Sequence, residues 1–326
     1  MTVQFGVVLP QGFKWDLPPN LDPVARYEAM TRVAVEAERL GYTSVWLADH
    51  LHAEMRPGSA PSPTEEMVFE CWTSAAALAR DTATIRIGQM VSCNLYRNPA
   101  LLAKMASTVD VLSHGRLDFG IGAGWYEGEA RAYDYTFPGV AERLQRLEEA
   151  LHIIHALWTE PVATFAGQHY QLQGAVNSPK GVQLPHIPLW VGGAGERTTL
   201  RLAARYGDAC NVIAHDAETV ARKFAALRVH CERSGRDYAA IRKSVQVFVV
   251  LLEPGEDLDA ATATRGAVSL EVVRRANIVG TAPEVAARLQ ALVDAGAEYF
   301  LLYFRNRLVQ LDTIQHFARE VMPLLV

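Results

Sequence analysis

The sequence predicts an α/β protein, a (β/α)8 barrel of the TIM type, with residues 1–326 forming one domain. Apolar runs of strand length and amphipathic helical patterns alternate from end to end, which is typical of strand–helix units around a parallel sheet. Eight of these runs are almost continuously apolar, as expected for strands that are covered on both faces. An open doubly wound sheet is the alternative. However, no glycine cluster follows the first strand, where a dinucleotide-binding fold would have one.

The first half of the chain is expected to supply four strand–helix units. Asp22 and Pro23 open the first helix as an N-cap and a first-turn proline, and Gly41 ends it. A Pro-rich loop over residues 56–63 precedes the second helix, and the turn 113–115 leads into the fourth strand. The strands are expected at 4–9, 44–48, 85–91 and 116–121, and the helices at 23–40, 71–79, 99–112 and 140–158.

The alternation breaks after the fourth helix, where residues 160–186 form an insertion between units. Residues 164–170 within it are typical of a small hairpin with a glycine turn. Residues 253–277 show no clear pattern and are predicted as an irregular or partly helical excursion. The remaining strands are expected at 187–192, 209–213, 245–252 and 299–303, and the helices at 198–206, 217–234, 283–295 and 311–325.

Composition and charge narrow the class of protein. The net charge is −5 and no dense Lys/Arg block occurs, so nucleic acid is not an expected partner. No apolar stretch approaches the roughly 20 residues that span a bilayer, and the chain begins as a strand and not as a signal peptide. The four cysteines form no Cys-x-x-Cys pair, which favours a reduced cytoplasmic protein.

In a barrel of this type the functional site lies where the strands end. Asp49 and His50 follow the second strand and form the strongest titratable pair at any strand end. A histidine there can move a proton near neutral pH, and an adjacent carboxylate can fix its tautomer. The alternatives are a loop histidine capped by backbone, or a metal site of His50, His52 and Glu54. No other strand end supplies a matching ligand, so no metal is expected.

Two strands end in glycines before a helix, at 122–125 and at 192–197. Bare backbone N–H groups at such an end can bind a phosphate, and the second cluster adds a cation and hydroxyls. Close packing of strand against helix is the alternative explanation. No Gly-x-Ser-x-Gly elbow and no pair of carboxylates at strand ends occurs. Polar loops and a phosphate site without a nucleophile favour a protein whose cofactor performs the chemistry.

At these residues the chain resembles the bacterial luciferase-like family of flavin and deazaflavin oxidoreductases. The resemblance extends over the whole length and depends on four segments taken together and in order. The Asp-His pair after the second strand is most similar to the branch that uses coenzyme F420, a deazaflavin. The four segments are 40–50, 96–104, 113–125 and 190–193.

The resemblance implies where a cofactor would bind. The ring would lie over the third strand, which in relatives carries a non-prolyl cis peptide bond, here at or near 89–90. His50 would lie beside the ring and steer or supply a proton, oriented by Asp49. The family also implies a homodimer and an insertion beside the substrate mouth. The residues expected to hold the cofactor are Gln89 and Met90 at the ring, and Gly193, Ala194, Gly195, Glu196 and Arg197 at the phosphate.

One departure bears on the substrate. The sugar-phosphate dehydrogenases of this branch have a carboxylate where this chain has Trp125, which argues against a sugar phosphate. Phe13, Trp15, Trp125 and Tyr126 would make an aromatic mouth for an apolar or polycyclic substrate, or would pack the insertion against the barrel. We therefore expect F420-dependent hydride transfer to or from an organic substrate. The alternatives are an FMN-dependent monooxygenase served by a separate reductase, and a flavin-binding barrel without catalysis.

Overall fold

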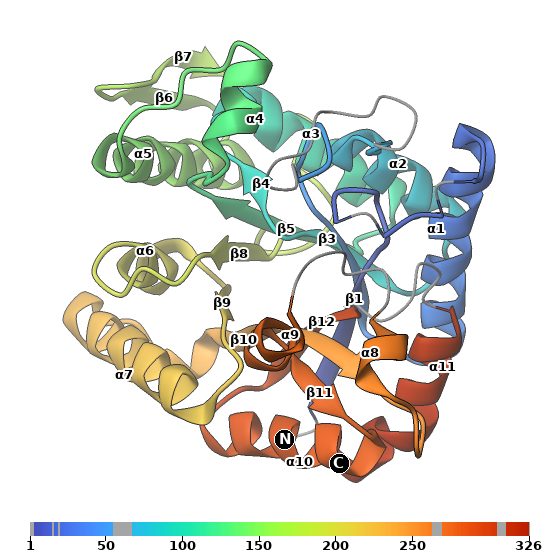
Figure 1. Ribbon diagram of the computed structural model, residues 1–326. Coiled ribbons are helices and arrows are strands. Elements are labelled where there is room, and N and C mark those ends of the chain that lie inside the picture. Colours follow the sequence, from blue (N-terminus) through green and yellow to red (C-terminus); the bar gives the residue numbers. More distant parts are fainter. Residues whose placement is uncertain are drawn as a thin grey trace.

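Eight parallel strands close into a barrel that the helices surround (Figure 1). The computed structural model describes residues 3–14, 16–18, 20–54, 67–262, 269–304 and 311–325. Each barrel strand pairs with the next in chain order, and the last, β12, pairs back with β1. The predicted barrel is thereby confirmed. Its strands are β1 (Gln4–Val8), β2 (Ser44–Leu47), β3 (Arg86–Gln89), β5 (Leu117–Gly122), β8 (Leu189–Gly192), β9 (Ala209–Ile213), β10 (Arg242–Leu251) and β12 (Tyr299–Phe304).

The outer helices follow the predicted positions closely. Asp22 caps the first helix by accepting a hydrogen bond from the Ala25 N–H, and Gly41 follows its end with φ of 80°. No helix in the described part of the chain is long and apolar enough to cross a membrane. The outer helices are α1 (Pro23–Arg39), α2 (Cys71–Asp81), α3 (Pro99–Leu112), α5 (Val140–Thr159), α6 (Thr199–Tyr206), α7 (Ala217–Ser234), α10 (Ala282–Asp294) and α11 (Leu311–Glu320).

The structure departs from the predicted elements at several places. The predicted strand 85–91 is interrupted: β3 ends at Gln89, the Met90–Val91 peptide bond is cis, and β4 (Ser92–Cys93) then pairs with β5. Three short elements escaped prediction because they are too brief to show a period. These are α4 (Glu127–Ala132), the turn η1 (Tyr238–Ala240), and β11 (Ile278–Gly280), which pairs with the end of β10. The predicted helix 311–325 ends earlier, since α11 stops at Glu320 and the turn η3 (Met322–Leu325) follows it.

Two regions outside the regular alternation have defined structure. The predicted hairpin consists of β6 (Ala163–Ala166) and β7 (Gln171–Ala175), which lie beside α5 (Figure 1). The Glu149 carboxylate of α5 accepts the backbone N–H groups of residues 168–170 in its turn. The excursion 253–277 contains α8 (Leu258–Ala261) and α9 (Leu270–Ala276), and residues 263–268 lie outside the described chain.

Large aromatic side chains fill the middle of the barrel. The Trp46 and Trp190 rings lie 4.8 Å apart, and Tyr299 packs on Trp190 at 5.3 Å. Gly88 makes this possible, because a Cβ at that position would lie 2.3 Å from the Trp46 ring. Real Cβ atoms essentially never come so close to another heavy atom. This aromatic layer closes the barrel, so the space above it is a pocket and not a pore.

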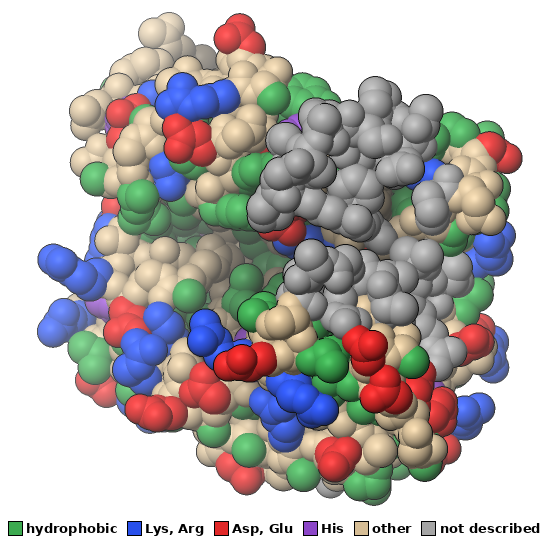
Figure 2. Space-filling view, in the orientation of Figure 1, with side chains coloured by type: hydrophobic (Ala, Val, Ile, Leu, Met, Phe, Trp, Pro, Cys, Tyr) green, Lys and Arg blue, Asp and Glu red, His purple; other side chains and the backbone are tan. Residues whose placement is uncertain are grey.

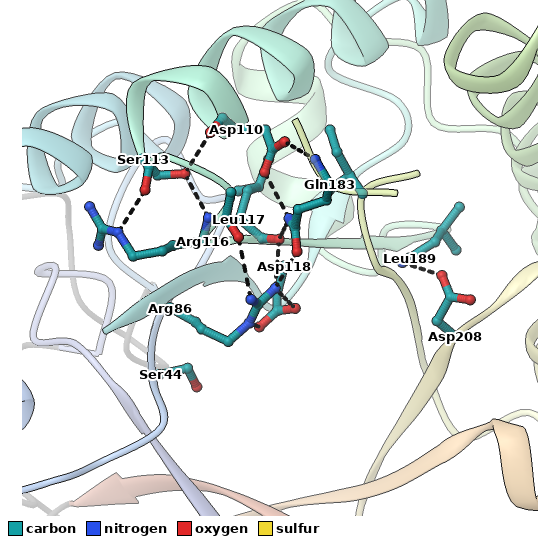
Figure 3. A network of polar contacts seen from close by, with 12 residues as sticks. Ser44, Arg86, Asp110, Ser113, Arg116, Leu117, Asp118, Gln183, Leu189 and Asp208 are labelled. Atoms are coloured by element: carbon teal, nitrogen blue, oxygen red, sulfur yellow. Dashed lines mark hydrogen bonds and ion pairs between the residues drawn. The ribbon is translucent and has the colours of Figure 1, made fainter. Parts of the chain in front are cut away.

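A polar network closes the N-terminal end of the barrel (Figure 3). Arg86, at the start of β3, binds both carboxylate oxygens of Asp118 in β5 at 2.7 and 2.8 Å. Gln183 accepts from Arg86 and donates to Asp110 at 2.7 Å, which ties α3 to the strands. Arg116 lies nearby, is 8% exposed, and donates five hydrogen bonds to protein oxygens. Charges at this end are therefore paired or fully hydrogen-bonded.

Candidate active site

A cavity of about 460 Å³ lies at the opposite, C-terminal end of the barrel. Residues at or just beyond the end of every barrel strand contribute to its wall, which is mostly apolar. Figure 2 shows this face of the molecule hollowed near its centre, with hydrophobic side chains around the hollow. The strand-end residues in the wall are Val8, Ala48–His50, Met90, Val91, Cys93, Gly122–Tyr126, Gly192, Gly193, Asn211, Ile213, Gln246, Phe248 and Tyr303.

His50 is the main titratable group in the wall of this cavity. Its imidazole stacks on the Phe13 ring at 3.5 Å and nearly parallel, at 4°. Its Nδ1 atom lies 2.8 Å from a carboxylate oxygen of Glu129. The second ring nitrogen, Nε2, has no hydrogen-bond partner among the described residues, which leaves it available to a ligand. The imidazole is thus fixed in plane and in orientation, as a proton-transfer group requires.

Glu129 replaces Asp49 as the carboxylate that orients His50, and this corrects our expectation. Successive side chains of an extended segment point in opposite directions, so neighbours in sequence need not meet. Asp49 instead binds Arg97 through both oxygens at 2.6 and 3.0 Å, and accepts the Cys93 N–H at 2.8 Å. Burial raises the pKa of Asp49, although the Arg97 guanidinium opposes this. Asp49 therefore fixes the segment after the cis bond.

Glu129 was not predicted as a site residue, because it lies on the short helix α4, which shows no helical period in the sequence. Its carboxylate is fully buried and, besides His50, accepts the Tyr96 hydroxyl at 2.6 Å and the Leu51 N–H at 2.6 Å. Burial alone would raise the pKa of Glu129, but the hydrogen bonds from His50 and Tyr96 outweigh burial and hold the pKa below its usual range. The carboxylate is accordingly ionised beside the imidazole.

The predicted aromatic mouth is partly assembled. Phe13, Trp125 and Tyr126 all line the cavity, and Trp15 lies outside the described residues. Trp125 stacks on Tyr126 with ring centroids 5.1 Å apart, yet 59% of its surface is exposed. A large apolar side chain left this open at a cavity rim is typical of a binding site. No residue of the β6–β7 hairpin lines the cavity, so the insertion does not form this wall.

The metal alternative receives no geometric support. The His52 ring donates to the Ala53 carbonyl at 2.8 Å, and Glu54 pairs with Lys14, so neither turns toward His50. Across the described residues no three His, Cys, Asp or Glu side chains gather as metal ligands would.

The second glycine cluster reaches the cavity only in part. Gly193, Gly195 and Thr199 line it, whereas Ala194, Glu196 and Arg197 do not. Gly193 has a φ of 131°, a conformation that only glycine adopts without strain. A Cβ at Gly195 would lie 2.9 Å from the Thr199 hydroxyl oxygen. The helix that follows, α6, has no side-chain cap, although the Leu200 N–H of its first turn donates to the Gly195 carbonyl at 3.0 Å. The glycine backbone just before α6 is therefore the part of this turn that an anion can approach.

The two remaining predicted cofactor residues differ in position. Met90 lines the cavity beside the cis bond, whereas Gln89 is fully buried in β3 and does not. The Gln89 amide has no hydrogen-bond partner among the described residues.

In the second glycine cluster, the Glu196 carboxylate pairs with Lys223 at 3.0 Å and with Arg222, so two cations of α7 already balance its charge. Arg197 is exposed to solvent.

Comparison with known proteins agrees with this geometry. The sequence profile described as luciferase-like monooxygenase matches residues 3–265. An F420-dependent hydroxymycolic acid dehydrogenase of Mycobacterium tuberculosis is 30% identical over 91% of this chain and 84% of its own length. An F420-dependent glucose-6-phosphate dehydrogenase of Kineococcus radiotolerans is also 30% identical, over 90% of this chain and 91% of its own. A solved F420-dependent secondary alcohol dehydrogenase, bound to an F420–acetone adduct, superposes with a TM-score of 0.83 over all of both chains at 20% identity.

Proposed function

Because the chain belongs to the luciferase-like monooxygenase family, we propose that it is an oxidoreductase that uses coenzyme F420 to move a hydride to or from an organic substrate. The two F420-dependent relatives, each similar over nine-tenths of this chain, support F420 as the cofactor. The observation in the structure that carries the proposal is the oriented His50, whose Nε2 faces an apolar cavity above a closed barrel.

The residues around the cavity fit a deazaflavin with a phosphate. Met90, Val91 and Gly122 offer a narrow apolar wall for a flat ring, and a Cβ at Gly122 would lie 2.6 Å from Val91. The uncapped start of α6, with Gly193 and Gly195 before it, suits the phosphate. When bound, the cofactor would supply the hydride chemistry, and the protein would supply position and proton transfer.

His50 would handle the proton that accompanies the hydride. When Nδ1–H is donated to Glu129, the neutral form of the imidazole presents an unprotonated Nε2. That atom can accept a hydroxyl proton when an alcohol is oxidised, and returns it to the oxygen when a carbonyl is reduced. The stack on Phe13 keeps the ring from turning away between these events.

The substrate would have a largely apolar body. Three apolar side chains at the mouth of the cavity are more than half exposed: Trp125 (59%), Val140 (62%) and Ile213 (51%). A bound apolar substrate would remove this surface from water. Burying it would contribute roughly 25 cal/mol for each Å² removed from water. An aliphatic or polycyclic alcohol or ketone fits this wall better than a sugar phosphate does.

A binding titration tests the cofactor. We expect the purified protein to bind F420 far more tightly than FMN when each titration is followed by fluorescence or calorimetry. Tight binding of FMN with no affinity for F420 would favour the monooxygenase alternative that the family name also allows.

Stopped-flow absorbance of the bound cofactor, mixed with long-chain and polycyclic alcohols and ketones, then separates an enzyme from a silent binder. Homodimerisation, supply of reduced cofactor by a separate reductase, and a cytoplasmic location remain predictions. Sedimentation of the purified protein tests the first of these.

A further inference from the structure

One buried cation at the cavity lacks a counter-charge. Arg143 lies in the first turn of α5, lines the cavity, and is 9% exposed. Its guanidinium packs over the Phe137 ring at 4.1 Å and donates one hydrogen bond, at 2.6 Å, to the Pro138 carbonyl. No carboxylate of the described residues lies within ion-pair distance of it, and its Nε–H has no acceptor among them.

Another buried arginine, Arg116, shows the contrast. Arg116 is 8% exposed and also has no carboxylate partner in the described part of the chain, but five hydrogen bonds to protein oxygens satisfy its guanidinium. Arg143 is as buried and makes one. A buried charge is costly unless hydrogen bonds or an opposite charge compensate it. Arg143 faces a cavity, so a ligand can bring the missing partner.

We propose that Arg143 binds an anionic group, a carboxylate or a phosphate, of the molecule that fills this cavity. A planar guanidinium with several free donors is the side chain best suited to an oxyanion. The proposal deepens the proposed function and rests on it, because it takes the cavity to be the cofactor and substrate site. Two sources supply the same chemistry: the acidic side chain of F420, and an acid group on the substrate.

The position of Arg143 sets it apart from the glycine cluster. Phe137, under the guanidinium, packs against the cluster of Cys93, Tyr96 and Ala130, which lies on the His50 side of the cavity. The Gly193–Thr199 turn belongs to β8 and α6 instead. An anion held by Arg143 is therefore a second anchor point, and it would fix which end of a long ligand lies near His50.

The cofactor arm of the test compares F420 with its precursor that ends at the ribityl chain and has neither phosphate nor glutamates. The Arg143→Met variant keeps the apolar contact with Phe137 and removes the charge, and Arg143→Lys restores the charge. Arg146→Met is the matched control, because Arg146 lies on the same helix but pairs with Glu142. If the anion belongs to F420, Arg143→Met reduces the preference for F420 over the precursor on the order of 10- to 100-fold.

The substrate arm measures binding of decanoate and decan-1-ol to the F420-loaded protein by calorimetry. If the anion belongs to the substrate, wild type prefers decanoate and Arg143→Met loses that preference by a similar factor, while Arg143→Lys keeps part of it. Unchanged preferences in both arms, in variants with wild-type melting temperatures, overturn the proposal. Wild type that binds neither F420 nor its precursor refutes the proposed function instead; the decanoate comparison on the cofactor-free protein then still decides the role of Arg143.

Discussion

The two ends of the barrel differ in whether some of their polar groups are left without partners. At the N-terminal end, Arg86 and Asp118 form a two-bond ion pair, and Gln183 completes the network (Figure 3). At the C-terminal end, the Nε2 atom of His50 and most of the Arg143 guanidinium have no partner among the described residues. Both ends are made from the same eight strands, so the difference comes from side chains and loops and not from the fold.

This contrast separates stability from function. A polar group that is paired inside the protein stabilises it and has nothing left for a ligand, whereas a group left incomplete costs stability and can bind. Substitutions at the N-terminal end should therefore lower the free energy of unfolding and leave activity and cofactor binding intact. Substitutions at the unpartnered groups of the C-terminal end should do the reverse. The variants below test that division, from the largest expected effect to the smallest.

Replacing His50 with alanine should give the largest effect, chiefly on rate. Loss of the proton-transfer atom Nε2 is expected to slow hydride transfer about 10²- to 10⁴-fold. Cofactor affinity should change little, and the loss of stability should be modest, because Glu129 keeps its hydrogen bonds from Tyr96 and Leu51. His52→Ala is the control, since His52 bonds to the Ala53 carbonyl and does not line the cavity. Stopped-flow absorbance measures the rate, and equal rates for wild type and His50→Ala would remove the histidine from the chemistry.

Replacing Asp118 with alanine should lower the stability of the protein and leave cofactor binding unchanged. It leaves Arg86 without its carboxylate at a site where Asp118 is 1% exposed, and loss of one partner of such a pair costs about 3–5 kcal/mol. We expect the lower end, because a quarter of the Arg86 side chain is exposed. Urea denaturation measures the loss, and F420 affinity should be retained. The surface pair Arg201–Glu148 is the control, and Glu148→Ala should cost less than about 1 kcal/mol.

The sequence predicted the stable end better than the functional one. Strand and helix patterns depend on local periodicity, which burial enforces over many residues, so the barrel and helices such as α3 were placed almost to the residue. His50, Gly193 and Trp125, which were singled out because strand ends in this fold carry the site, do line the cavity.

Glu129 and Arg143 were missed for a physical reason. Glu129 lies on a six-residue helix without a period, and it meets His50 from 79 positions away. In the sequence, Arg143 looks like an ordinary exposed residue on the polar face of an amphipathic helix. Only the structure, with the guanidinium packed over the Phe137 ring, shows that it is buried. Conversely, the family resemblance predicted Glu196 and Arg197 at the phosphate, but neither lines the cavity and α7 balances the charge of Glu196.

Replacing Glu129 with glutamine should affect both properties moderately, because Glu129 is paired and also serves the site. We expect hydride transfer to slow about 10-fold, since the amide would hold the imidazole less firmly. The lowered pKa of Glu129 means that the ionised carboxylate stabilises the fold above its ordinary pKa of about 4.3. That stabilisation is lost as pH falls from there through the lowered pKa.

The stability difference between wild type and Glu129→Gln should therefore be constant above about pH 5 and shrink below it. Urea denaturation at a series of pH values measures it. Glu127→Gln is the control, because Glu127 lies on the same helix, is half exposed and pairs with Arg131. A difference that stays constant down to pH 3 (about one unit below the ordinary pKa) would show that the carboxylate gains nothing from its buried contacts.

Replacing Glu38 with glutamine should give the smallest effect, and an effect on stability only. The Glu38 carboxylate, on the last turn of α1, accepts the backbone N–H groups of Ala83 and Ile85 at 2.9 and 2.8 Å, which fixes the loop that enters β3. Burial would raise the pKa of Glu38, but these N–H groups lower it overall. The side-chain amide of glutamine can accept only some of these hydrogen bonds, so we expect the free energy of unfolding to fall by about 1–2 kcal/mol. Glu28→Gln is the control, because Glu28 lies on the same helix and is exposed. Urea denaturation measures the loss, and a change in F420 affinity would mean that the two ends of the barrel are coupled.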